Sequence, residues 1–121
     1  MIVLDTNILI EILKGNDETI KKVESLTDSL SISSISVMEL YYGALNKVEL
    51  NKLEKFVSLF NIIHLNENIS KSSTKLIKHY AKSHNLDIPD SLIASTVLEN
   101  DATLLTYNVK DFKYIEEMKL L

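Results

Sequence analysis

The chain has 121 residues, which is enough for one compact domain and too few for two. It has no cysteine, so a disulfide framework, a zinc finger and a thiol nucleophile are excluded. The formal net charge is −4 and all 13 basic residues are Lys, which argues against a protein that coats nucleic acid but leaves room for a nuclease with an acidic metal site.

The N-terminal part of the chain predicts a strand followed by two helices. Residues 1–4 form a short apolar run that ends at Asp5, a pattern typical of a buried strand. Because no basic residue precedes this run and an acid interrupts it, we expect neither a signal peptide nor a membrane span, and we expect a cytoplasmic protein. Residues 7–14 have apolar side chains at helical spacing, and residues 17–26 predict a more polar second helix.

The middle of the chain continues this alternation of strands and helices. Residues 30–35 alternate Leu or Ile with Ser and predict a second strand. Two helices are predicted next, at residues 36–45 and 49–60, and a third strand at residues 61–65. A long helix is expected over residues 69–84, because its apolar residues recur on one face.

The C-terminal part completes an α/β pattern. Residues 89–100 predict a helix, residues 102–106 a fourth strand, and residues 119–121 are a candidate fifth strand. Strands that alternate with helices favour a three-layer α/β/α sandwich with a central, mainly parallel sheet of four to five strands. Since the chain has only two Gly, one Pro and no linker segment, we expect residues 1–121 to form a single domain.

Four acids are predicted to meet at one edge of this sheet. In a doubly wound sheet the strand C-termini and the helix N-termini share an edge, outside which ligands bind. Asp5 ends the first strand, and Asp111 follows the fourth strand. Glu39 lies in the first turn of the predicted helix 36–45, and Asp90 lies in the first turn of the predicted helix 89–100. A set of oxygen ligands without His or Cys suits a hard cation such as Mg²⁺ or Mn²⁺.

Each acid also has a purely structural interpretation. Ser36 and Glu39 match a capping box, Asp90 suits the positive end of a helix dipole, and Asp5 and Asp111 suit N-caps. On the residues alone, both interpretations stay open. The remaining aspartates fit no common pattern and are interpreted as surface or turn acids: Asp17, Asp28, Asp87 and Asp101.

Four segments, in this order and spacing, resemble the PIN-domain ribonucleases and in particular the VapC-type toxins of toxin–antitoxin pairs. They are VLDTNILIEIL at 3–13, SISVMELYYGA at 34–44, PDSLIASTVL at 89–98 and LLTYNVKDF at 104–112. The resemblance covers essentially the whole chain, and it favours the metal interpretation over four separate helix caps.

The resemblance implies a set of site residues and a cofactor. Asp5, Glu39, Asp90 and Asp111 match the acidic catalytic residues that hold Mg²⁺ or Mn²⁺, and no other cofactor is implied. Thr6 and Asn7 match the polar neighbours of the first acid, while Thr106 and Asn108 match the hydroxyl and amide that order the last acid. Tyr107 departs from the family pattern, because many members carry Arg or another polar residue there.

The resemblance also implies partners and a reaction. It implies an RNA substrate, a homodimer, and a VapB-type antitoxin whose C-terminal segment occupies the active-site groove, with no membrane involved. We therefore expect a metal-dependent endoribonuclease that hydrolyses RNA phosphodiester bonds as the toxin of a VapBC-type pair. The sequence offers no Ser–His–Asp set, and His64, His79 and His84 lie outside the four segments.

Other interpretations remain beside this one. One is a PIN-fold module that binds RNA without catalysis, and another is a doubly wound signalling receiver domain, although the acid pair that such a domain needs is absent. A dehalogenase-like phosphatase would need a second Asp where Asn7 stands. Finally, the stripe of Lys71, Lys75, Lys78 and Lys82 is interpreted as a solvated helix face, with an RNA-backbone track as the alternative.

Overall fold

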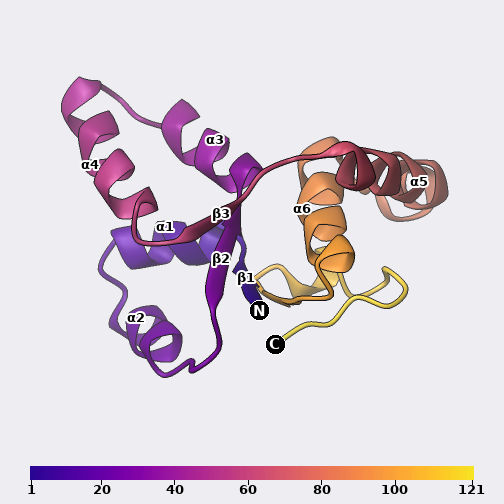
Figure 1. Cartoon of the computed structure of the whole chain (residues 1–121), viewed down its shortest axis with the longest axis horizontal. Helices are drawn as coiled ribbons and strands as arrows, with labels where there is room; N and C mark the ends of the chain where they lie inside the picture. The colour runs from indigo at the N-terminus through magenta and orange to yellow at the C-terminus, as the bar shows by residue number, and fades with distance from the viewer.

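The computed structural model describes all 121 residues and contains one parallel sheet (Figure 1). Its strands are β1 (Ile2–Leu4), β2 (Leu30–Ser33), β3 (Asn61–Ile63) and β4 (Thr103–Leu105), in the order β3-β2-β1-β4. Each neighbouring pair is parallel. This order differs from the 2-1-3-4-5 order of receiver domains, so that alternative is wrong.

Helices cover both faces of the sheet, which confirms the predicted sandwich. In Figure 1, α1 to α4 lie on one side of the sheet and α5 and α6 on the other. The helices are α1 (Thr6–Leu13), α2 (Asp17–Glu24), α3 (Ser34–Tyr42), α4 (Lys47–Val57), α5 (Glu67–His84) and α6 (Ile88–Glu99), followed by the short 3₁₀ helix η1 (Val109–Asp111). None of these helices has the length and apolar character needed to cross a membrane.

The sheet separates two hydrophobic cores. Successive strand residues point to opposite faces, so Leu4 packs into the core beneath α1 to α4 while Val3 packs into the core beneath α5 and α6. In β4, Leu105 and Leu104 divide in the same way. All four side chains are at most 1% exposed, which explains why β1 and β4 read as short apolar runs rather than as alternating patterns.

The predicted second strand and the candidate fifth strand differ from the structure. The second strand ends at Ser33 rather than at residue 35, because the Ser33 hydroxyl accepts a hydrogen bond from the Ile35 N–H and caps α3. Glu39 is therefore one turn further along the helix than predicted, and the capping box of Ser36 and Glu39 is wrong. The predicted fifth strand is also wrong, because only one isolated bridge joins Leu120 to Leu104.

Candidate active site

Asp5 lies where the buried strand β1 turns into α1. Its side chain is 5% exposed, and one carboxylate oxygen accepts the Thr6 backbone N–H at 2.8 Å. The other oxygen accepts the Thr106 hydroxyl at 2.7 Å and the Asn7 amide at 3.3 Å. Burial raises the pKa of Asp5 above its usual value, and the hydrogen bonds from Thr106 and Thr6 partly oppose this rise.

The loop after β4 is tied to the start of α1. The Asn7 side-chain oxygen accepts the Tyr107 backbone N–H at 3.2 Å, while the Asn7 amide lies 3.4 Å from the Thr106 hydroxyl. The Tyr107 hydroxyl forms a hydrogen bond with the hydroxyl of Thr19, a buried residue of α2. Hydrogen bonds therefore hold both the backbone and the ring of Tyr107. They give a structural role to a residue whose role the family resemblance leaves open.

Thr106 and Asn108 act on the site differently from the expectation. The resemblance implied that they order the last acid, but the Thr106 hydroxyl donates to the first acid, Asp5. Asn108 contributes backbone groups: its N–H donates to the Thr106 hydroxyl at 2.9 Å, and its carbonyl accepts the Asp111 N–H at 3.0 Å. These bonds shape the turn that leads to Asp111.

Glu39 is held by the residue that follows Asp5. The Thr6 hydroxyl donates to one Glu39 carboxylate oxygen at 2.8 Å and is also 2.8 Å from the hydroxyl of Ser36. Thr6 therefore contacts two of the predicted site acids, one through its backbone and one through its side chain. Sequence reasoning missed Ser36 in this role, because it had interpreted that residue as a helix cap.

Asp90 lies in the first turn of α6, as predicted. Its backbone N–H donates to the Asp87 carboxylate at 2.9 Å, so Asp87 caps the helix rather than being an ordinary surface acid. Burial, followed by repulsion from Asp87, Asp5, Asp111 and Glu39, raises the pKa of Asp90 to about 7. The carboxylate of Asp90 accepts no hydrogen bond from the chain.

Asp111 is the last residue of η1, so its interpretation as an N-cap is wrong. Its half-buried carboxylate accepts no hydrogen bond from the chain, but its charge raises the pKa of both Asp5 and Asp90. The structure therefore brings all four predicted acids into one electrostatic field at the C-terminal edge of the sheet.

No basic side chain is paired with these four acids. The ion pairs of the chain are Met1 with Asp28, Lys14 with Glu11, Lys71 with Glu67, and Lys119 with Asp101. Carboxylate oxygens that have no positively charged partner are the kind of ligand that a hard cation prefers. As the side chains stand, however, no three acidic, His or Cys residues are grouped closely enough to hold one ion.

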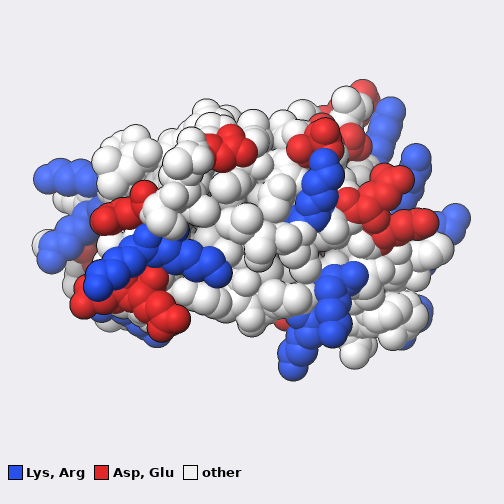
Figure 2. All heavy atoms as spheres, turned by 90° about the horizontal axis from the view of Figure 1, so that it is seen from below, with Lys and Arg blue, Asp and Glu red and all other residues white.

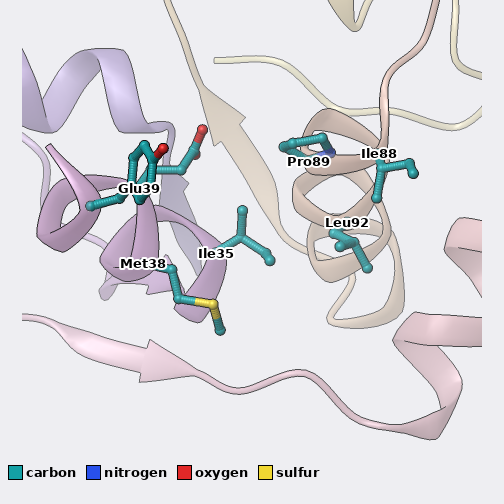
Figure 3. A pocket seen from close by; sticks show the side chains of 7 residues that line it. Ile35, Met38, Glu39, Ile88, Pro89 and Leu92 are labelled. Atoms are coloured by element: carbon teal, nitrogen blue, oxygen red, sulfur yellow. The ribbon is translucent and has the colours of Figure 1, made fainter.

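An apolar groove begins at Glu39 and runs between α3 and α6 (Figure 3). It has a volume of about 500 Å³, and Ile35 of α3 points across it toward Leu92 of α6. Its lining residues are Ile35, Met38, Glu39, Tyr42, Ile88, Pro89 and Leu92. On its other side, Glu39 also borders a smaller groove of about 320 Å³ near Leu13 and Leu53.

The outer charges do not form a basic surface on the face drawn in Figure 2. Lys and acidic side chains are intermingled there at both ends of the molecule, and the middle carries few charges. Lys71, Lys75, Lys78 and Lys82 are all exposed on α5. Lys71 lies 3.8 Å from Glu67 in an exposed pair, which contributes little to stability.

The sequence matches the PIN domain family over residues 2–117, and the chain belongs to this family. It is 30% identical to "Ribonuclease VapC19" of Mycobacterium tuberculosis over 98% of each chain, and 35% identical to "Ribonuclease VapC2" of Rickettsia felis over 97% of this chain and 93% of that one. It is also similar to the crystal structure of VapBC2 from Rickettsia felis bound to a promoter DNA fragment, with a TM-score of 0.85, 33% identity, and coverage of 100% and 98%.

Proposed function

We propose that this protein is a metal-dependent endoribonuclease and the toxin of a VapBC-type toxin–antitoxin pair. Membership of the PIN domain family and similarity to proteins named ribonuclease VapC support a nuclease. The observation that carries the proposal is the set of four carboxylates that share one field without a basic partner, in which the pKa of Asp90 is raised to about 7.

In this proposal Asp5, Glu39, Asp90 and Asp111 hold Mg²⁺ or Mn²⁺. A divalent ion at such a site supplies positive charge to phosphoryl oxygens and makes a water more acidic. Because Asp90 and Asp111 accept no hydrogen bonds, their side chains can turn toward a cation without breaking any. Asp5, by contrast, is already fixed by three donors.

The supporting polar residues orient the buried acid and favour its ionised form. The hydroxyl of Thr106 and the backbone N–H of Thr6 donate to the charged form of Asp5, and so offset part of the cost of burial. Asn7 adds a third donor and links Asp5 to the loop that carries Asn108. These residues position the acids, and we assign them no direct role in bond cleavage.

The test is cleavage of single-stranded RNA by the purified full chain. We expect cleavage with Mg²⁺ or Mn²⁺ and none with excess EDTA, and activity should return when the metal is added back. Asp101→Asn is a matched control, because Asp101 is an exposed acid paired with Lys119 outside the site. Full activity in EDTA would falsify the metal dependence.

We further propose a homodimer with a VapB-type antitoxin as its partner. The similar structure from Rickettsia felis is described as a VapBC complex on promoter DNA, which supports an antitoxin partner. Co-expression with the product of a small neighbouring reading frame should give a co-purifying complex with reduced RNase activity, and light scattering should give the mass of a dimer for the toxin alone. A cytoplasmic location stays a prediction from the sequence.

A further inference from the structure

Ser36 is buried beside the site but forms no hydrogen bond with any of the four acids. It lies in α3 three residues before Glu39, so the two side chains share a face of the helix. Its side chain is 0% exposed, and its hydroxyl has one hydrogen-bond partner, the hydroxyl of Thr6 at 2.8 Å. The same Thr6 hydroxyl is 2.8 Å from a carboxylate oxygen of Glu39.

The number of protons fixes the direction of these two hydrogen bonds. A hydroxyl has one proton to donate, and an ionised carboxylate can only accept. The heavy-atom positions also let Thr6 donate to Ser36, but one proton serves one acceptor at a time. While Thr6 donates to Glu39, its contact with Ser36 is a hydrogen bond only with Ser36 as the donor. The chain of donors runs from Ser36 to Thr6 to Glu39, and each bond in such a chain strengthens the next.

This direction matters because Glu39 is otherwise free to move. Its side chain is exposed at the rim of the groove, and a glutamate in such a place has large rotamer freedom. The Thr6 hydroxyl is the only group of the chain that donates to it. With Ser36 as the donor, the oxygen of Thr6 is occupied and its proton is left for Glu39. Without the Ser36 hydroxyl, Glu39 alone would orient the Thr6 hydroxyl, which could then turn to donate to water.

We propose that Ser36 is a positioning residue that acts on Glu39 through Thr6. It aims the single proton of Thr6 at Glu39 and so holds this carboxylate toward the edge where Asp5 lies. The inference rests on the proposed function, because it takes Glu39 as part of the metal site. Ser36 itself contacts neither substrate nor metal in this assignment.

The experiment measures metal binding by the full chain as well as RNA cleavage. The readout is the Mn²⁺ concentration that gives half of the maximal rise in melting temperature, since that rise reports binding to the folded state. We expect Thr6→Val to raise this concentration by roughly 10- to 100-fold, as for loss of an outer partner of a metal ligand. Ser36→Ala should raise it by about two- to tenfold, the factor that corresponds to one neutral hydrogen bond.

A double-mutant cycle separates positioning from general packing. If Ser36 acts only through Thr6, Ser36→Ala should add nothing to the Mn²⁺ requirement of Thr6→Val. In EDTA the double variant should melt higher than Thr6→Val alone, because that single variant leaves the buried Ser36 hydroxyl without a partner. Thr6→Ser keeps the hydroxyl and should keep the Mn²⁺ response of the parent.

Ser95→Ala is the matched control, because Ser95 is a fully buried helical serine whose hydroxyl has no partner. It should leave the Mn²⁺ requirement unchanged. If Ser36→Ala does not fold, Ser36→Cys replaces it, since a thiol fills similar space but donates weakly. Two results would overturn this inference but not the proposed function. One is a Ser36 variant that binds Mn²⁺ like Ser95→Ala, and the other is a Ser36 variant whose effect adds fully to that of Thr6→Val. A parent chain that shows no Mn²⁺ shift and no metal-dependent cleavage overturns the proposed function and the inference with it.

Discussion

The two halves of the candidate site are built in opposite ways. On the side of β1 and α3, Asp5 and Glu39 accept hydrogen bonds from hydroxyl, amide and backbone donors. On the side of α6 and η1, Asp90 and Asp111 accept none, and repulsion from the other acids helps to raise the pKa of Asp90 to about 7. The first half is fixed by hydrogen bonds within the chain, whereas the second half remains under charge repulsion.

This difference separates two demands on one site. Hydrogen bonds from Thr6 and Thr106 make the first half part of the folded structure, so changes there should affect stability and activity together. The second half carries an electrostatic cost that a cation would remove. Sites that trade stability for function commonly show this pattern.

Asp5→Asn should reduce RNA cleavage by a factor of at least about 100, the upper end of the cost of losing an outer-shell metal partner. The substitution keeps the shape of the side chain but removes the charge of a hard anionic ligand. Rates measured under single-turnover conditions with saturating Mn²⁺ give the comparison, and Asp101→Asn serves as the control at an exposed acid. Near-normal turnover would remove Asp5 from the site.

Thr106→Val should lower the free energy of unfolding by about 1–3 kcal/mol, because it removes a donor from a buried carboxylate. The hydroxyl of Thr106 donates to Asp5 at 2.7 Å, and the valine methyl group that replaces it cannot. Thr106→Ser keeps the donor and should lose much less. Urea unfolding of the three proteins in EDTA measures this difference, and equal losses for Val and Ser would show that packing rather than the hydrogen bond stabilises the first half.

Asp90→Asn should have the opposite sign and stabilise the metal-free protein. Its folded pKa of about 7 lies above the ordinary value of 3.8, so the folded state holds the proton more tightly than the unfolded state. The parent therefore loses stability as pH rises from about 4 through 7, and Asn removes that loss. Above pH 7 we expect a gain of about 1 kcal/mol, or roughly 3–6 °C in melting temperature for a domain of this size.

Two further measurements sharpen the prediction at Asp90. The difference between variant and parent should close as the pH falls below 4, and the variant should lose most of the Mn²⁺-induced rise in melting temperature. Asp87→Ala is the matched control, because it removes the cap of α6 and should destabilise by about 0.5–2 kcal/mol. An Asp90→Asn protein that melts lower in EDTA and keeps the full Mn²⁺ shift would restore the helix-dipole interpretation.

The smallest effect is expected on α5, outside both halves. Changing Lys75 and Lys78 to Gln should leave the salt dependence of RNA binding unchanged, because these exposed side chains are interpreted as a solvated face. If the stripe contacts the RNA backbone instead, the slope of log affinity against log salt should decrease by roughly one to two units. Fluorescence anisotropy with a labelled RNA in the Asp5→Asn background avoids cleavage during the titration.

Much of this arrangement could be predicted from local patterns and one topological rule. Apolar or alternating patterns identified the four strands, and the shared edge of a parallel sheet placed Asp5, Glu39, Asp90 and Asp111 together. The start of α3 could not be predicted, because Ser33 and Ser36 are both good caps and only the end of β2 decides between them. The Thr106 hydroxyl donates to Asp5, which lies 101 positions earlier in the sequence. A local sequence pattern cannot predict a contact between residues so far apart.

That long separation has a consequence for how the protein is made. Asp5 and its partner Thr106 lie near opposite ends of the chain, and β1 pairs with β4 in the sheet. Synthesis proceeds from the N-terminus, so the first acid is made early and stays without its hydroxyl donor until β4 has been added. Contacts of such long range form late and slowly during folding. The candidate site is therefore absent from every nascent chain that lacks β4, and a site built in this way cannot be complete until the segment from Thr103 to Asp111 has been made.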